Sequence, residues 1–227
     1  MKTFDWFVFD ADDTLWDCQG HFERVMQQLY TMLEPWTDRT TAARELFATE
    51  RKNMPLLGFG TKAFTLSMME TALRVSKGEM SGQELNRLQQ LCYTLLQLPA
   101  TPLPGVVQTL QKLQDRGQRM AVFTKGELLD QEHKLERSGL LRFFDHVEIT
   151  SDKGQREFRV LAEKLGVEPS RMVMVGNSLK SDIAPALAIG AWGIYIPFAV
   201  TWELEHHDHF DHERMTTLDR FSQLLDL

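Results

Sequence analysis

Two aspartates, Asp10 and Asp12, follow an apolar run near the N-terminus and are the first residues in the chain that could do chemistry. In an extended backbone, side chains two positions apart point to the same side. Two carboxylates this close repel each other unless a cation bridges them or one of them holds a proton. A hard cation such as Mg²⁺ takes oxygen ligands and would suit the pair. One carboxylate could then attack an electrophile while the other transfers protons.

Polar side chains also follow three later apolar runs. Thr124 offers a hydroxyl and Lys153 a positive charge, and both suit an anionic oxygen such as that of a phosphoryl group. Asn177 and Asp182 follow the last of these runs. Each residue alone has an ordinary explanation as a turn, surface or helix-start residue. Together, an aspartate nucleophile, a divalent metal and donors for a phosphate form a consistent set for phosphoryl transfer.

The apolar runs predict the strands that would bring these groups together. We expect strands at residues 4–10, 120–124, 146–149, 172–175 and 192–196. Helical periodicity lies between the later runs, and strand alternating with helix predicts an α/β fold. Its Rossmann-like core would have three layers, with a mainly parallel sheet covered on both faces. In such sheets functional groups gather beyond the carboxyl ends of the strands, which is where the candidate residues stand.

The alternation fails over residues 15–99, which show helical periodicity only. Apolar residues step there by three and four positions, as at Val25 and Leu29. This pattern predicts about four helices and no strand. Residues 1–14 and 100–227 would then form the catalytic core, and residues 15–99 would form an inserted all-helical cap.

Composition limits the class of protein. The 227 residues carry a formal net charge of −7, which argues against a nucleic-acid binder held by a general positive field. The two cysteines, Cys18 and Cys92, suggest a reducing compartment. The start of the chain lacks the pattern of a secretory signal, and its apolar stretches fall far short of the ~20 residues of a membrane span. We therefore expect a cytoplasmic protein with no membrane or nucleic-acid partner.

Two further features are weaker candidates for a function. Lys62 stands in the glycine-containing tract 58–64, which would be either a substrate-facing loop or an ordinary helix connection. The tract His206–His212 is rich in histidine and could bind Zn²⁺ or Ni²⁺. We favour the simpler interpretation of the second tract, a polar surface segment.

Taken together, the motifs resemble those of the haloacid dehalogenase-like hydrolase superfamily. The family's first motif is an apolar strand followed by D-x-D-x-T. It is matched by WFVFDADDTLW, in which Asp10, Asp12 and Thr14 occupy the motif positions. AVFTKG resembles the second motif at Thr124, and SDKGQREF resembles the third at Lys153. VGNSLKSDI resembles the fourth, from Gly176 to Asp182. The similarity spans essentially the whole core, and the helical insertion resembles the family's cap.

The resemblance implies a phosphatase that works through an aspartyl-phosphate. Asp10 would be the nucleophile, and Asp12 would act first as acid and then as base. The dehalogenase branch of the family lacks the second aspartate, so Asp12 favours a phosphatase. Mg²⁺ would be held by the Asp10 carboxylate, the Asp12 carbonyl and the fourth motif, which here supplies Asn177 and Asp182.

The resemblance also assigns the phosphate donors and shows one departure. Thr124 and Lys153 would bind the phosphoryl oxygens, and Lys153 would also steady Asp10. Asn177 stands where the family usually has an aspartate ligand. An amide oxygen can still bind Mg²⁺ but brings no charge, so we expect weaker metal binding than an aspartate there would give. Asp182 would then supply the charge, directly or through water.

Three functions are consistent with this sequence. The leading one is a Mg²⁺-dependent phosphatase that hydrolyses a small phosphorylated metabolite. A phosphomutase would use the same residues but return the phosphoryl group to the sugar. A non-catalytic phosphate-binding or scaffold protein on the same fold is the alternative of another class, and Asn177 is the feature that raises it. The intact pair Asp10 and Asp12 argues against it, because a binder has no need of a nucleophile and an acid together.

Overall fold

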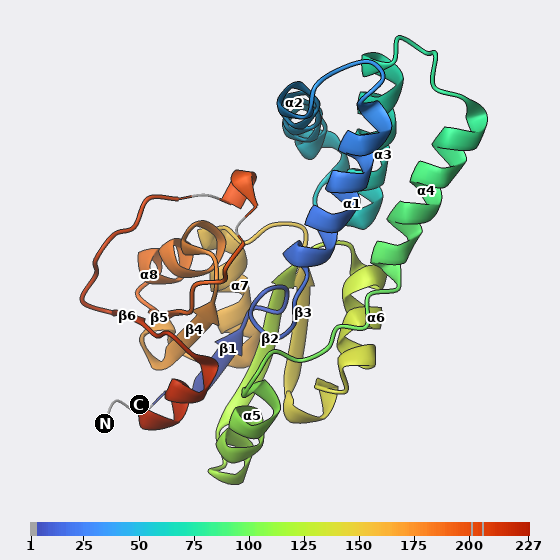
Figure 1. The fold of residues 1–227 in the computed structure, drawn as a ribbon. Coiled ribbons are helices and arrows are strands. Elements are labelled where there is room, and N and C mark those ends of the chain that lie inside the picture. The colour runs from blue at the N-terminus through green and yellow to red at the C-terminus, as the bar shows by residue number, and fades with distance from the viewer. Residues whose placement is uncertain (1–3, 201, 206) are drawn as a thin grey trace. The chain divides into compact units, whose positions relative to one another are not determined.

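In the part of the chain that the structure describes, six strands form a single sheet in which every neighbouring pair is parallel. The structure, a computed structural model, describes residues 4–200, 202–205 and 207–227. The strands are β1 (Trp6–Phe9), β2 (Arg119–Lys125), β3 (His146–Thr150), β4 (Met172–Gly176), β5 (Trp192–Tyr195) and β6 (Met215–Thr217). Their order is β3-β2-β1-β4-β5-β6, so β1 lies inside the sheet between β2 and β4 (Figure 1). The predicted α/β fold with a parallel sheet is confirmed.

Helices cover both faces of this sheet (Figure 1). They are α5 (Val106–Asp115), α6 (Leu128–Ser138), α7 (Gln155–Leu165) and α8 (Ala184–Ala188). Side chains of β1 alternate between the two layers: Phe7 and Phe9 pack with α5 and α6, whereas Trp6 and Val8 pack with α7 and α8. Burying a large apolar side chain stabilises the fold by about 1.5–3 kcal/mol. The carboxyl end of β1 is therefore held firmly from both sides, and the residues that follow it start from a fixed position.

The sequence pattern does not predict β6. This strand has only three residues, and its two threonines, Thr216 and Thr217, are exposed. It pairs in parallel with β5 at the edge of the sheet. Because one side of an edge strand has no partner strand and its side chains are not enclosed, β6 lacks the apolar run that marks the inner strands.

A separate helical unit spans Gly20–Leu98, and the sheet unit comprises Met1–Gln19 and Pro99–Leu227. The helices of the helical unit are α1 (Gln19–Leu33), α2 (Arg39–Leu57), α3 (Thr61–Val75) and α4 (Gly82–Leu96). Local signals fix their starts: the Asp38 side chain accepts a hydrogen bond from Thr41 N, and Ser81 and Glu84 form a reciprocal capping box. The apolar positions predicted from periodicity, such as Leu29, line the buried faces. Within the described part of this unit there is no strand, as the sequence predicts.

The first residues assigned to the helical segment by the sequence belong with the sheet unit instead. Leu15 and Trp16 are fully buried in the core beneath the sheet. The Leu15 carbonyl accepts a hydrogen bond from Leu103 N, and Trp16 bridges to Pro102. The chain thus leaves and re-enters the core at neighbouring points.

Over the described ranges, none of the helices has both the length and the apolar character that a membrane crossing needs. Both cysteines, Cys18 and Cys92, are buried free thiols. The cytoplasmic location stays a prediction.

Candidate active site

Asp10 stands at the carboxyl end of β1, where its backbone N–H continues the sheet by donating to Val175 O at 2.9 Å. Its carboxylate is buried. Oδ1 forms an ion pair with Lys153 Nζ, and Oδ2 accepts a hydrogen bond from Thr14 Oγ1 at 3.1 Å. Lys153 Nζ also donates to Asp182 Oδ1 at 2.7 Å. The buried Lys153 ammonium group therefore joins the carboxylates of Asp10 and Asp182, which are far apart in the sequence.

Charge and burial oppose each other at this cluster. Burial, followed by the nearby Asp182 carboxylate, raises the pKa of Asp10 to about 7, although Lys153 acts to lower it. Burial disfavours the charge on Lys153, but Asp10 and Asp182 more than offset it, and the pKa of Lys153 lies above its ordinary value. The lysine is therefore a permanent cation, and it can stabilise a negative oxygen that arrives at Asp10.

Asp12 lies in a tight loop that its neighbours close. Leu15 N donates to Ala11 O at 2.8 Å, and Asp13 N donates to Trp16 O at 2.7 Å. Asp13 adopts a left-handed backbone with φ of 63°, a conformation that aspartate and asparagine tolerate better than most residues. This turn directs the two aspartates of the motif into different surroundings.

The Asp12 carboxylate has a lysine of its own. Lys134 Nζ donates to Oδ1 at 2.9 Å and to Oδ2 at 2.7 Å. Trp16 Nε1 donates to Oδ1 at 2.7 Å, and Gln131 Nε2 donates to Oδ2 at 3.1 Å. Burial acts to raise the pKa of Asp12, but Lys134, then Trp16 and Gln131, hold it below its ordinary value. Asp12 is therefore ionised in the free protein, whereas Asp10 titrates near neutral pH.

Thr124 is joined to Asp12 through one side chain. Gln131 Nε2 donates to Thr124 Oγ1 at 2.7 Å as well as to Asp12. A hydroxyl that accepts a hydrogen bond still has its own proton to donate. Gly126 permits this approach, because a Cβ there would lie 3.1 Å from Gln131 Cγ. The threonine at the end of β2 is thus held beside the acid–base candidate with its proton available to an anionic oxygen.

Asn177 and Asp182 both lie in the turn after β4, but they contact different groups. Asp182 is buried, and its two oxygens bind Lys153 Nζ and Ser178 N, the latter at 2.9 Å. Gly176 makes room for it, since a Cβ at that position would lie 2.6 Å from Asp182 Cβ. Each of its oxygens accepts one hydrogen bond and has a further lone pair, so the role of Asp182 at the metal stays a prediction. Its observed contacts are those of a partner to the lysine.

Asn177 points one end of its amide at three oxygen atoms. They are the Asp12 carbonyl oxygen at 3.2 Å, Asp10 Oδ2 at 3.3 Å and Thr14 Oγ1 at 3.0 Å. With its nitrogen at this end, the amide donates hydrogen bonds to these oxygens. With its oxygen there, a carboxylate, a backbone carbonyl and an amide oxygen converge, and this is the donor chemistry that Mg²⁺ takes. The residues present therefore fit the expected cation.

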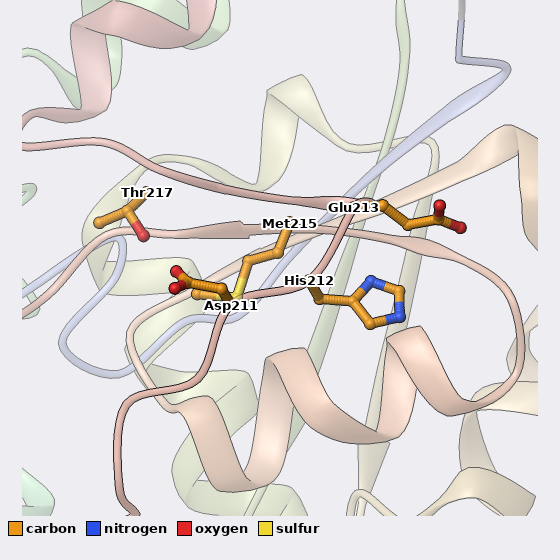
Figure 2. Close-up of a pocket in the computed structure, with 5 residues that line it drawn as sticks. All are labelled: Asp211, His212, Glu213, Met215 and Thr217. Carbon is orange, nitrogen blue, oxygen red and sulfur yellow. The ribbon is translucent and has the colours of Figure 1, made fainter.

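The histidine-rich tract stays untested as a metal site. Across the described ranges, no three side chains of His, Cys, Asp or Glu group as a metal-binding cluster. His206 lies outside the described residues, and His207 and His209 are exposed, as a polar surface segment requires. An open pocket of ≈ 330 Å³ is lined by the end of this tract and by β6, through Asp211, His212, Glu213, Met215 and Thr217 (Figure 2). It contains none of the residues around Asp10.

Lys62 is exposed at the start of α3 in the helical unit. Its role as a substrate contact stays a prediction.

Lys134 and Gln131 are the site residues that the sequence analysis missed. They lie on the buried face of α6 next to Leu135, whereas Leu128 and Leu129 of the same helix are exposed. Apolar periodicity alone would predict that the face with Leu128 and Leu129 is buried and that Gln131 and Lys134 are exposed. The usable signal was a lysine and a glutamine three positions apart in the helix that follows the strand of Thr124.

Comparison with known proteins gives a consistent result. The haloacid dehalogenase-like hydrolase family matches residues 4–190. The chain is 28% identical over 232 residues to a glyceraldehyde 3-phosphate phosphatase of Methanothermobacter thermautotrophicus, covering 96% of this chain and 97% of that protein. It is 25% identical over 213 residues to a pyrimidine 5'-nucleotidase of Escherichia coli, covering 89% and 87%.

Among solved structures, a haloacid dehalogenase-like family hydrolase from Xanthomonas campestris is similar over the whole fold. Its TM-score is 0.88 at 31% sequence identity, and the match covers 97% of this chain and 88% of that one.

Proposed function

Because the chain belongs to the haloacid dehalogenase-like hydrolase family and is a phosphoric monoester hydrolase, we propose that it is a Mg²⁺-dependent phosphatase with an aspartyl-phosphate intermediate on Asp10. One observation carries the proposal. Two carboxylates at the end of β1 have separate buried lysines, Lys153 for Asp10 and Lys134 for Asp12. Separate environments give the two carboxylates separate tasks.

Asp10 is the nucleophile in this proposal. In the first step one of its oxygens forms a bond to phosphorus, the ester P–O bond breaks, and Asp12 gives a proton to the leaving oxygen. In the second step a water oxygen bonds to phosphorus, the bond from Asp10 to phosphorus breaks, and Asp12 takes the proton of the water. The products are inorganic phosphate and an alcohol, and Asp10 returns to its carboxylate form.

Asp12 must gain a proton before the first step. In the free protein Lys134 keeps it ionised. A phosphoryl dianion bound beside this carboxylate raises its pKa, because a second negative charge disfavours the ionised form. Substrate binding itself would therefore load the acid, and loss of the leaving group would leave Asp12 ready to act as a base.

Phosphoryl oxygens would be held by Thr124 and Lys153. Two of the three Lys153 ammonium protons bind Asp10 and Asp182, which leaves one for the phosphoryl group. Mg²⁺, when bound, would neutralise charge on the phosphoryl oxygens. The Asp10 carboxylate, the Asp12 carbonyl and the Asn177 amide oxygen are the groups that would hold it.

The substrate is proposed to be a small phosphorylated metabolite. The matched relatives are named for a triose phosphate and for pyrimidine nucleotides, so sugar phosphates and nucleoside monophosphates are the first two classes to assay.

The test is phosphate release from 4-nitrophenyl phosphate. We expect Mg²⁺-dependent turnover that a chelator abolishes, and a loss of at least ~10³-fold in kcat for Asp10→Asn, which keeps the shape of the side chain but removes the nucleophile. Acid quenching during turnover of a ³²P-labelled substrate should trap label on the wild-type protein in a form that hydroxylamine releases. Full activity of Asp10→Asn, or no trapped label at any quench time, would contradict the proposal.

A further inference from the structure

A carboxylate from a distant part of the chain is attached to the turn that follows β4. Glu205 ends a short 3₁₀ turn, Glu203–Glu205, in the connection between β5 and β6. Its side chain is only 14% exposed. Its carboxylate forms an ion pair with Lys125 Nζ and accepts hydrogen bonds from Ser178 Oγ at 2.7 Å and Ser181 Oγ at 2.5 Å.

These contacts hold Glu205 in its charged form. Burial disfavours ionisation, but Lys125 and the two serine hydroxyls hold the pKa of Glu205 below its ordinary value. Lys125 Nζ also donates to Ser181 Oγ at 2.7 Å. The cluster therefore ties the end of β2, the turn after β4 and the 3₁₀ turn together through one carboxylate.

The turn that Glu205 binds is a π-helical turn, Leu179–Ile183. Ser178 caps the start of this turn: its Oγ accepts a hydrogen bond from Ser181 N at 3.0 Å, and its backbone N–H donates to Asp182 Oδ2. Wide turns of this kind are uncommon and occur often at functional sites. The hydroxyls that bind Glu205 are thus part of the hydrogen bonding that sets the shape of the turn.

The same turn holds two residues of the active site. Asn177 immediately precedes Ser178, and Asp182, the partner of Lys153, immediately follows Ser181. A shift of either serine would move the Asn177 amide away from Asp10 Oδ2, which is 3.3 Å from it. We infer that Glu205 is a positioning residue that fixes this turn and thereby sets the affinity of the site for Mg²⁺. The inference rests on the proposed Mg²⁺-dependent function.

The test compares Glu205→Gln with Glu203→Gln. Glu203 lies in the same 3₁₀ turn but is exposed, so it is a matched control. Isothermal titration of the chelator-treated, full-length proteins with Mg²⁺ gives Kd directly, without activity. Loss of an outer partner of metal ligands typically weakens binding 10–100-fold. We expect about a tenfold higher Kd for Glu205→Gln and the wild-type Kd for Glu203→Gln, with the kcat of both variants equal to that of the wild type at saturating Mg²⁺.

A second variant keeps the test decisive if Glu205→Gln fails to fold. Ser181→Ala removes one hydroxyl and leaves the backbone N–H that donates to Ser178, and it should raise Kd severalfold. A Kd for Glu205→Gln or Ser181→Ala equal to that of Glu203→Gln would overturn the inference alone. Wild-type protein that binds no Mg²⁺ in the same titration would overturn the proposed function as well.

Discussion

Two aspartates separated by one alanine have opposite acid–base behaviour in this molecule. Burial raises the pKa of Asp10 to about 7, whereas the charge of Lys134 and hydrogen bonds from α6 and Trp16 hold the pKa of Asp12 below its ordinary value. Pairs of groups whose pKa values are driven apart by their surroundings are characteristic of acid–base catalysis. Bound Mg²⁺ would favour the ionised form of Asp10, because an opposite charge favours ionisation. The surroundings of the two residues are thus consistent with the proposed roles, Asp10 at the metal and Asp12 in proton transfer.

Asn177 provides the sharpest prediction for a single residue. Asn177→Asp would place a third carboxylate beside Asp10, because the amide lies 3.3 Å from Asp10 Oδ2. Without metal this repulsion should lower the melting temperature, and with metal the added charge should tighten Mg²⁺ binding roughly tenfold. Thermal melts in chelator and calorimetric titration with Mg²⁺ measure the two effects. Equal Mg²⁺ affinity in the variant and the wild type would show that Asn177 is not a ligand.

At the level of elements, α6 contributes more to the site than its sequence suggests. Its buried face carries Asp130, Gln131 and Lys134, and Lys134 contacts both oxygens of Asp12. Breaking a fully buried ion pair by removing one partner destabilises a protein by about 3–5 kcal/mol. Here the Asp12 side chain is 28% exposed and keeps its hydrogen bonds from Trp16 and Gln131, so the cost should be smaller, about 1–3 kcal/mol. Lys134 therefore links α6 to the loop after β1, beside the packing of Leu135 in the core.

We expect Lys134→Met to lose stability on this scale. The pKa of Asp12 should rise in the variant, but its carboxyl group loses the lysine that holds both of its oxygens in place, so we expect a larger loss of activity on alkyl phosphates than on 4-nitrophenyl phosphate. An alkyl leaving group needs the proton of Asp12, whereas a nitrophenolate leaves without it. Urea unfolding and paired kcat measurements test both effects. Lys164→Met is the control, because it removes a lysine from an exposed pair with Glu148 and should cost about 1 kcal/mol or less. Equal losses of stability in the two variants, or equal losses on the two substrates, would contradict the role of Lys134.

The strands and helices also show which parts of the fold and of the candidate site could be predicted from the sequence. The inner strands are marked by apolar runs, and residues at their carboxyl ends, such as Asp10 and Thr124, follow from the topology alone. Lys134 could not be found in this way, because exposed Leu128 and Leu129 give α6 a misleading pattern. Glu205 could not be found either, since its inferred role depends on contacts with residues 24 and 27 positions away in the chain. Local periodicity contains no information about such pairings.

For the whole molecule, the helical unit is an insertion at one point of the core. Trp16 and Pro102 are bridged, so the chain returns to the core beside the place where it left. An insertion that begins and ends at one place can vary without disturbing the sheet. A substrate contact by Lys62 of the helical unit stays a prediction, and the residues proposed to be catalytic all belong to the sheet unit.

Asp13, at the start of that connection, should contribute to the pH dependence of the stability of the protein. Burial raises its pKa to about 7, although Cys18 N and Gln19 N, which donate to Oδ1 at 2.8 and 2.9 Å, act to lower it. A carboxyl group with a raised pKa binds its proton more tightly in the folded state. Its stabilising contribution is complete below the unfolded pKa of 3.8 and is lost as the pH rises through about 7.

Asp13→Asn removes this titration but keeps its structural contacts. A single amide oxygen can accept both backbone hydrogen bonds, and asparagine tolerates the left-handed φ of 63°. The variant should match the wild type near pH 4 and exceed it by roughly 1–2 kcal/mol at pH 8, less than a full shift would give because the side chain is half-buried. Urea unfolding in chelator from pH 4 to 8 measures the difference, with the exposed Asp208→Asn as the control for loss of one charge. A difference that does not change with pH would show that Asp13 is ionised in the folded protein throughout this range, and that the connection is held by hydrogen bonds to a carboxylate.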